Sequence, residues 1–209
     1  VHYSASNQPI TLQETYITMK IRQLLVLGTA LVSLSTASLF AAEEVSVQYK
    51  YEGDHGIDFS AMRGSFSVGT FTDDRGIENG KLITDSDLGS GNGGYVAEEE
   101  LSVLVQDALA QGFTSGGAEL VTADADMSLS GSVLSTEAQI IERDGAQLLQ
   151  LTIRASVQLR TGSRTAWQTT LFGRGRVAVD EGMAVAVRAS LDRIIRELVL
   201  DDYFLQEVL

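Results

Sequence analysis

The sequence has 209 residues, with 28 acidic and 15 basic side chains, a formal net charge of −13 at pH 7, a single proline and no cysteine. Acidic proteins repel nucleic-acid phosphates and anionic lipid headgroups, so we expect neither as a partner. The lack of cysteine excludes disulfide bonds and thiol catalysis, and it leaves no thiol for lipid attachment.

An export signal is predicted near the N-terminus, and it opens at Met19 rather than at the first residue. Two basic residues follow, then a short apolar run, then small residues that end at Ala42. This order is typical of a secretory signal peptide, and the apolar run is too short to span a bilayer. We therefore predict a signal peptide at residues 19–42 and interpret residues 1–18 as an extension from a misassigned start.

Residues 43–209 suit one globular domain that carries its own core. Without Glu14, Lys20 and Arg22, this domain keeps 13 basic and 27 acidic residues, which is a net charge of −14. It contains no further run of membrane-spanning length. We expect a periplasmic or secreted product that is exported by its signal peptide, is not lipid-anchored and has no membrane span.

The first half of the domain shows two strand patterns and one helix pattern. Apolar residues alternate with polar ones in both strand patterns. The helix pattern has apolar residues at helical spacing, three glutamates in its first turn and Gly112 as the expected residue after its end. The predicted elements are strands at 44–51 and 65–72, a loop at 73–95 and a helix at 97–111.

The second half is rich in strands and ends in a helix. Every odd position from Leu149 to Leu159 is apolar and every even position is polar, as in a sheet with one buried face. The predicted elements are strands at 125–135, 137–143, 147–160 and 165–179, a helix at 181–200 and a short amphipathic tail. The fold class is therefore α+β, an antiparallel sheet of four to five strands with two helices packed on one face.

Three short motifs in this order resemble the YajG-like lipoprotein family. They are Phe71–Gly76 at the end of an early strand, Gly112-Phe113 at the end of a helix, and Ala125–Gly131 in the strand that follows. The resemblance implies an envelope protein of Gram-negative bacteria without established activity, and related folds serve as auxiliary lipoproteins of transporters or activators of cell-wall synthases. The sequence departs from the pattern in lacking the lipobox cysteine.

Catalytic and metal-binding patterns are weak. His55 stands alone in a charged loop, where a solvated side chain is a better interpretation than a catalytic base. The Asp- and Gly-rich loop at 85–93 resembles a calcium loop, but Gly89 and Val96 occupy positions that need oxygen ligands. Asp124 and Asp126 fit a solvated strand edge. We predict no enzyme activity, no cofactor and no metal.

Arginines provide the candidate binding residues. Arg75 follows two aspartates, so it either holds a turn or contacts a partner. On the outward face of the predicted hairpin, Arg154, Arg174 and Arg176 would lie beside Phe172. Arginine and aromatic residues are enriched at binding hot spots, whereas alternating charge is also ordinary on a solvated sheet face, and both interpretations stay open.

These observations favour a non-enzymatic periplasmic accessory or binding protein of the bacterial cell envelope, whose partner is an envelope protein or a wall component. The alternative is a carrier of a small apolar ligand or lipid, with a pocket between helices and sheet near Trp167 and Leu171. An unrecognised hydrolase ranks last. The sequence does not specify the oligomeric state.

Overall fold

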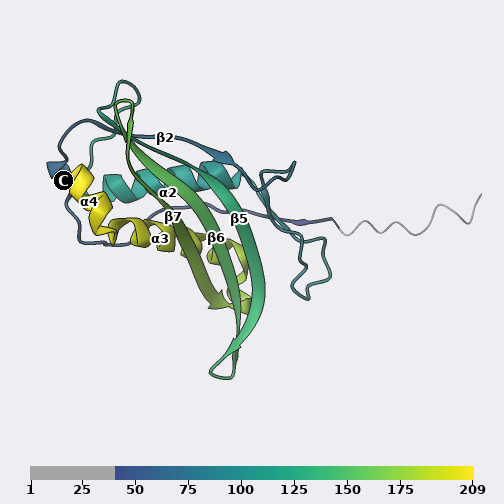
Figure 1. Cartoon of the computed structure of the whole chain (residues 1–209). Coiled ribbons are helices and arrows are strands. Elements are labelled where there is room, and N and C mark those ends of the chain that lie inside the picture. The colour runs from purple at the N-terminus through teal and green to yellow at the C-terminus, as the bar shows by residue number, and fades with distance from the viewer. Residues whose placement is uncertain (1–40) are drawn as a thin grey trace, which may run out of the picture. The chain divides into compact units, whose positions relative to one another are not determined.

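Four long strands form the main sheet of the protein (Figure 1). The computed structural model describes residues 41–209. The strands lie in the order β2-β5-β6-β7, with β5, β6 and β7 antiparallel to one another. Their bounds are β2 Phe66–Asp73, β5 Met127–Arg143, β6 Ala146–Thr161 and β7 Arg164–Ala178. The predicted α+β class is confirmed.

One pairing in this sheet differs from the prediction. β2 runs parallel to β5, with Phe66 opposite Met127. Parallel neighbours need a crossover connection, which here includes the helix α2 (Leu101–Ser115). The strands predicted at 125–135 and 137–143 are one strand, β5, whose register against β6 shifts between Val133 and Ser135.

A second, small sheet includes β3 and the start of β4, which lie in the region predicted as a loop. Its strands β1 (Glu43–Val45), β4 (Tyr95–Ala97) and β3 (Leu82–Thr84) lie in the order β1-β4-β3. The strand predicted at 44–51 therefore ends at Val45. These strands have three residues each, which is too short for an alternating pattern to be recognised.

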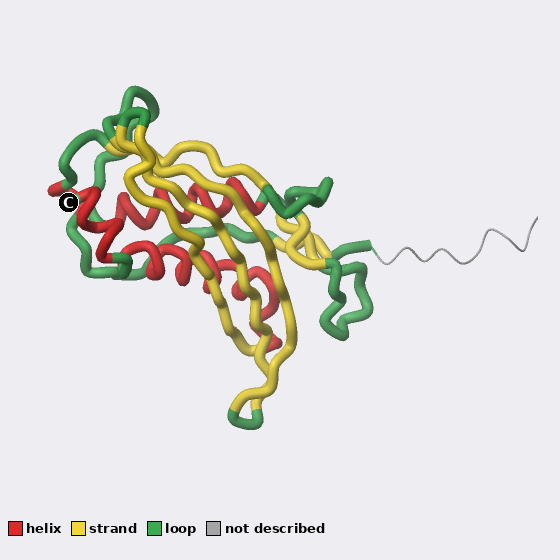
Figure 2. Tube along the Cα trace, in the orientation of Figure 1, coloured by secondary structure: helices red, strands yellow, loops and turns green. Residues whose placement is uncertain are grey.

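Helices α2 and α3 (Gly182–Val199) cover one face of the main sheet, and α4 (Asp202–Val208) forms the C-terminal tail (Figures 1 and 2). The helix predicted at 181–200 is confirmed as α3, but α2 begins four residues later than predicted. Gly112 lies inside α2 rather than after it, and a Cβ there would meet Ile195 Cγ2 of α3 at 2.8 Å. This glycine therefore lets the two helices approach each other.

Two further glycines bring α3 against β7. A Cβ at Gly173 would lie 2.4 Å from the Ser190 carbonyl oxygen, and a Cβ at Gly175 would lie 2.5 Å from the Ala186 carbonyl oxygen. The buried Ser190 hydroxyl accepts a hydrogen bond from Gly175 N at 3.1 Å and lies 2.8 Å from the Ala186 oxygen. Side chains larger than hydrogen would push the helix off the sheet.

The space between sheet and helices is filled by aromatic and aliphatic side chains. Phe113 packs on Phe59 and Phe66, with ring centroids 5.0 and 4.7 Å apart. The ring centroid of Trp167 is 5.0 Å from that of Phe204 in α4, and Trp167 is only 8% exposed. The Trp167 side chain thus contributes to the core where a carrier would need an open pocket.

An extended segment, residues 46–58, runs alongside α2 and α3, and we call it the strap (Figure 2). Tyr51 N donates to Gln111 Oε1 of α2 at 2.9 Å, and the Tyr49 hydroxyl donates to Asp192 Oδ1 of α3 at 2.7 Å. The strap forms no backbone hydrogen bonds of a β-sheet, so the side chains of Tyr49, Gln111 and Asp192 hold it in place. The N-terminal 3₁₀ turn Phe59–Ala61 follows it.

The predicted extension at 1–18, and all but the last two residues of the predicted signal peptide at 19–42, lie outside the described residues. None of the helices within residues 41–209 combines the length and the apolar character needed to cross a bilayer.

We expect Gly175→Ala to lower the free energy of unfolding by about 2 kcal/mol or more, because the new methyl group would overlap α3 backbone. Urea denaturation measures the change. Gly69→Ala in β2 is the matched control, since its methyl group would come no closer than 3.3 Å to another atom, the Ser128 hydroxyl oxygen, and we expect less than about 1 kcal/mol there. Equal losses in both variants would contradict this account of the α3–β7 contact.

Candidate functional site

The open face of the main sheet, opposite the helices, brings together four of the five residues predicted for partner binding. Arg154 on β6 lies directly opposite Phe172 on β7. The Arg154 guanidinium carbon is 5.2 Å from the centre of the Phe172 ring, a cation–π arrangement. Arg174 and Arg176 follow on the same face of β7, and we call these four residues the arginine patch.

This patch is exposed and carries surplus positive charge. Phe172 is 44% exposed, which is high for a large apolar side chain. Arg176 Nε donates to Gln150 Oε1 at 2.7 Å, a neutral partner on β6. Among the described residues, no carboxylate lies within ion-pair distance of Arg154, Arg174 or Arg176. The three arginines therefore present uncompensated charge on an acidic protein.

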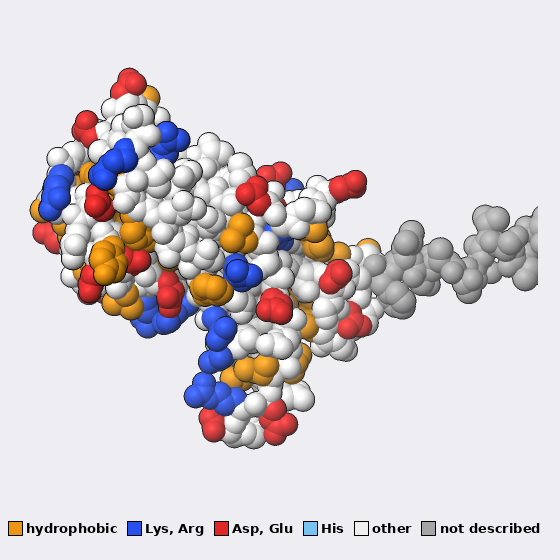
Figure 3. Space-filling view, viewed as in Figure 1, with side chains coloured by type: hydrophobic (Ala, Val, Ile, Leu, Met, Phe, Trp, Pro, Cys, Tyr) orange, Lys and Arg blue, Asp and Glu red, His pale blue; other side chains and the backbone are white. Residues whose placement is uncertain are grey.

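The rest of this face is mostly neutral and polar. Serines, glutamines and threonines continue the outward rows of β5, β6 and β7 beyond the patch. The broad white area of Figure 3, with basic and apolar side chains gathered below it, is consistent with this division. The outward residues include Ser128, Ser130, Ser132, Ser156, Gln158, Gln168 and Thr170.

A groove of about 760 Å³ lies beside the patch, between β7, α3 and the strap. Arg174 and Arg176 line it from β7, and Arg193 and Arg196 line it from the exposed side of α3. We call it the β7–α3 groove. Its other wall is formed by strap residues that include Tyr51.

Asp192 fixes the strap wall of this groove to α3. Burial, the hydrogen bond to Asp192 and the negative charge of Asp192 all raise the pKa of Tyr49, so its hydroxyl remains a donor. Burial and the charge of Asp192 also raise the pKa of Tyr51, which Arg196 partly offsets. The carboxylate of Asp192 is thus engaged by the strap.

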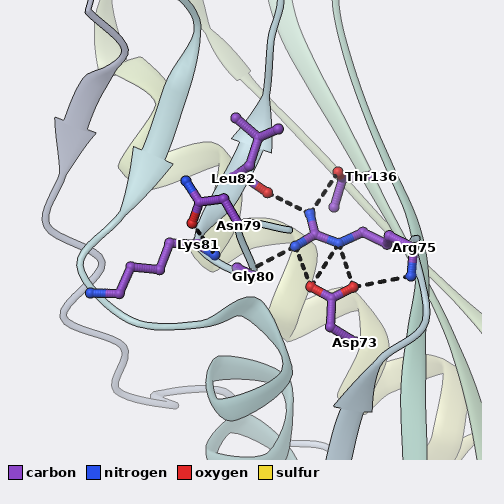
Figure 4. A network of polar contacts seen from close by, with 7 residues as sticks. All are labelled: Asp73, Arg75, Asn79, Gly80, Lys81, Leu82 and Thr136. Atoms are coloured by element: carbon purple, nitrogen blue, oxygen red, sulfur yellow. Dashed lines mark hydrogen bonds and ion pairs between the residues drawn. The ribbon is translucent and has the colours of Figure 1, made fainter. Parts of the chain in front are cut away.

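Arg75, the fifth predicted residue, lies apart from the patch in a buried network (Figure 4). Its side chain is 4% exposed, and Nη2 is 2.5 Å from Asp73 Oδ2. The guanidinium also donates to the Gly80 and Leu82 carbonyl oxygens and to the Thr136 hydroxyl at 3.2 Å. The network joins the end of β2 to β3 and β5, as expected of the turn-holding interpretation.

The pKa of Asp73 reflects the same network. Burial alone would raise the pKa of this carboxyl, but the side-chain and backbone hydrogen bonds from Arg75, together with its charge, hold that pKa below its usual range. The pair is thus ionised and internally neutralised.

His55 differs from the solvated side chain that we predicted. Its Nε2 is 2.9 Å from the Gly112 carbonyl oxygen near the end of α2, and Nδ1 accepts from Ile57 N at 3.1 Å. The ring also lies 5.4 Å from that of Phe59. His55 therefore fastens the strap to α2.

The acidic loop at 85–93 folds into local turns. Asp87 Oδ1 accepts from Gly89 N at 3.0 Å, which is a self-contained Asx turn. Among residues 41–209, no group of three or more His, Asp or Glu side chains is arranged to hold a metal ion.

Asp126, one of two aspartates interpreted as a solvated strand edge, links the start of β5 to the start of β2. Its Oδ2 accepts from Ser65 Oγ at 2.8 Å and from Ser65 N at 2.9 Å, while Asp126 N donates back to Ser65 Oγ. These bonds, first from the side chain and then from the backbone of Ser65, lower the pKa of Asp126. Asp124, two residues earlier, has a positive φ of 53°.

The family model of LptE, described as lipopolysaccharide-assembly, matches residues 87–201. The chain belongs to the LptE family. The matched segment includes β4, α2, β5, β6, β7 and α3, and so contains the whole arginine patch. Arg75 and the strap lie outside it. The resemblance to the YajG-like family is not confirmed by this match.

A solved structure with a TM-score above 0.5 shares the fold at low sequence identity. Protein XCC0632 from Xanthomonas campestris has a TM-score of 0.56 at 17% identity, with 76% of this chain and 93% of that chain covered. A minor lipoprotein from Acinetobacter baumannii reaches a TM-score of 0.36 at 12% identity, covering 50% and 85% of the two chains. No curated protein matches the sequence.

Sequence reasoning did not identify the groove residues Arg193 and Arg196. Both sit on the solvent side of α3, where a charged residue is the ordinary choice. Their proximity to Arg174 and Arg176 depends on how α3 packs against β7, and only the glycines of β7 hint at that contact.

We expect Arg75→Met to lower the free energy of unfolding by about 3–5 kcal/mol, because it leaves the Asp73 carboxylate buried without its partner. The double variant Asp73→Asn/Arg75→Met should recover part of that loss. Lys50→Met is the matched control, since Lys50 is 80% exposed in its pair with Glu52, and we expect less than about 0.5 kcal/mol. A small effect of Arg75→Met in urea denaturation would contradict the role assigned to this network.

A second prediction concerns the Ser65–Asp126 pair and pH. A lowered folded-state pKa stabilises the protein above the unfolded value of about 3.9, and this contribution disappears as pH falls through the lower folded value. Ser65→Ala should therefore raise the pKa of Asp126 in an NMR titration. Its stability deficit relative to wild type should narrow as pH falls from 7 towards 2. An unchanged Asp126 titration would contradict the assignment.

Proposed function

We propose that this protein is a non-enzymatic accessory protein of the bacterial envelope that acts in lipopolysaccharide assembly. In this role it binds another envelope protein or a wall component through the arginine patch. Arg75 is left out of this surface, because its guanidinium is buried and paired. The remaining four residues, Arg154, Phe172, Arg174 and Arg176, form the proposed contact.

The observation that carries this proposal is the position of the patch. It lies within the segment that matches the lipopolysaccharide-assembly family, on the sheet face that the helices leave uncovered. An exposed aromatic ring beside arginines has the composition of a protein-binding hot spot. The neutral polar rows beside it allow close approach without charge repulsion.

The proposal includes export to the envelope as a product without a lipid anchor. A signal peptide at residues 19–42 supplies export, and a sequence without cysteine supplies no thiol for lipidation. The YajG-like resemblance, although unconfirmed, agrees with an envelope protein without catalytic activity.

A carrier of a small apolar ligand or lipid is less well supported. The pocket expected near Trp167 and Leu171 is replaced by packing, since both side chains are buried and Trp167 contacts Phe204. We therefore do not propose it as the main function.

We expect Arg174→Glu/Arg176→Glu to abolish complementation of a strain that lacks the gene, measured as lipopolysaccharide at the cell surface. Charge reversal would turn an attractive contact into a repulsive one. Arg63→Glu/Arg188→Glu is the matched control, because it changes net charge equally away from the open sheet face, and it should complement. Immunoblots must show equal protein levels.

Two results would contradict the proposal. Full complementation by the patch variant would exclude the patch as the contact. Normal surface lipopolysaccharide in the strain without the gene would exclude the role in lipopolysaccharide assembly.

A further inference from the structure

The β7–α3 groove carries more positive charge than its surroundings neutralise. Arg193 forms an ion pair with Glu197, one turn along α3. Within residues 41–209, neither Arg174 nor Arg196 has a carboxylate at ion-pair distance. Two carboxylates also line the groove, Asp54 and Asp192, and Asp192 accepts a hydrogen bond from the Tyr49 hydroxyl, so the four arginines outnumber the acidic groups of the lining. An anionic occupant would complete these interactions.

The charges are spread along the groove rather than gathered at one point. Arg174 and Arg176 are two residues apart on a strand, which separates them by roughly 7 Å. Arg193 and Arg196 are three residues apart on a helix, roughly one turn. Two such rows match several carboxylates spaced along a chain better than one phosphate group, which is normally held by converging donors.

The backbone along one wall points to the same kind of occupant. Within the described part of the chain, β7 is an edge strand of the main sheet and has only β6 as a ladder neighbour. Gly175 lines the groove with backbone alone, between the side chains of Arg174 and Arg176. An edge strand has main-chain groups that an added strand can pair with, and side-chain contacts on alternate positions then provide specificity.

We propose that the β7–α3 groove binds an acidic, extended segment of a partner protein, which pairs with the edge of β7 and places its carboxylates against Arg174, Arg176, Arg193 and Arg196. Its volume of about 760 Å³ suits a short segment rather than a folded domain. This site is separate from the patch, although Arg174 and Arg176 line both, and it deepens the proposed function by naming a partner chemistry.

The test uses the protein from Glu43 onward and a fluorescein-labelled peptide of eight alternating Glu and Thr residues, followed by fluorescence anisotropy. Arg193→Gln/Arg196→Gln should weaken binding about tenfold or more, because two charged contacts are lost. Arg160→Gln/Arg188→Gln removes the same charge outside the groove and should bind as wild type does. Thermal unfolding confirms that each variant is folded.

Two modified peptides separate charge from strand pairing. A peptide with Gln in place of Glu should bind at least tenfold more weakly, since its carboxylates are gone. A peptide N-methylated at every residue keeps its charges but loses all of its backbone donors, and it should also bind more weakly. Equal binding of either modified peptide, or no binding of the original one, would overturn the proposal.

Inorganic phosphate and phosphatidylglycerol vesicles serve as competitors at matched ionic strength. Displacement of the peptide by millimolar phosphate, or vesicle binding that depends on Arg193 and Arg196, would overturn the proposal in favour of a phosphate or lipid site. Phe172→Ala, which alters only the patch, should leave peptide binding unchanged. Failure of the groove experiment leaves the proposed function standing, because Arg154 and Phe172 belong to the patch alone. Full complementation by Arg174→Glu/Arg176→Glu would count against the patch and against the groove as a contact in the cell, because these two arginines line both.

Discussion

The close contact between α3 and β7 determines which face of the main sheet is buried and which face carries exposed side chains. Gly173 and Gly175 let the helix backbone approach to a distance at which any side chain would collide with the Ala186 or Ser190 carbonyl oxygen. The Ser190 hydroxyl accepts a hydrogen bond from the backbone N–H of Gly175 beneath the sheet. Because the helix occupies one face so closely, the side chains of the alternate residues must lie on the other face or at the strand edge.

The same contact brings two charged elements together. α3 presents Arg193 and Arg196 on its solvent side, and its proximity to β7 places them beside Arg174 and Arg176. The strap closes the third side through the bond between Tyr49 and Asp192. Patch and groove are therefore consequences of one packing arrangement rather than two unrelated features.

Much of this fold could be predicted from alternation alone. The odd positions of β6 from Leu149 to Leu159 are all buried, as their pattern indicates, and α3 matches its predicted range closely. Local patterns failed where partners lie far apart in sequence. The direction of β2 depends on the crossover through α2, and the strands of the small sheet are too short to show a period.

The candidate site also has one part that the sequence predicts and another that depends on tertiary contacts. Arg154 and Phe172 were predicted to share a face because strand periodicity fixes it, and the register makes them direct neighbours. Arg75 belongs elsewhere, since its aspartate partner and two carbonyl oxygens surround it in the fold. The groove could not be predicted, because its walls come from a strand, a helix and a segment without secondary structure.

The segment Phe172–Arg176 alternates large exposed residues with glycine. Its packing depends on which of these residues point to each face of the sheet. Insertion of one residue before Phe172 that shifted this segment by one position would exchange the two faces. The glycines would then face solvent, and guanidinium groups would be driven into α3. The fold therefore tolerates replacement of individual exposed side chains in this strand, whereas the length of the strand upstream of the segment is constrained as strictly as the core.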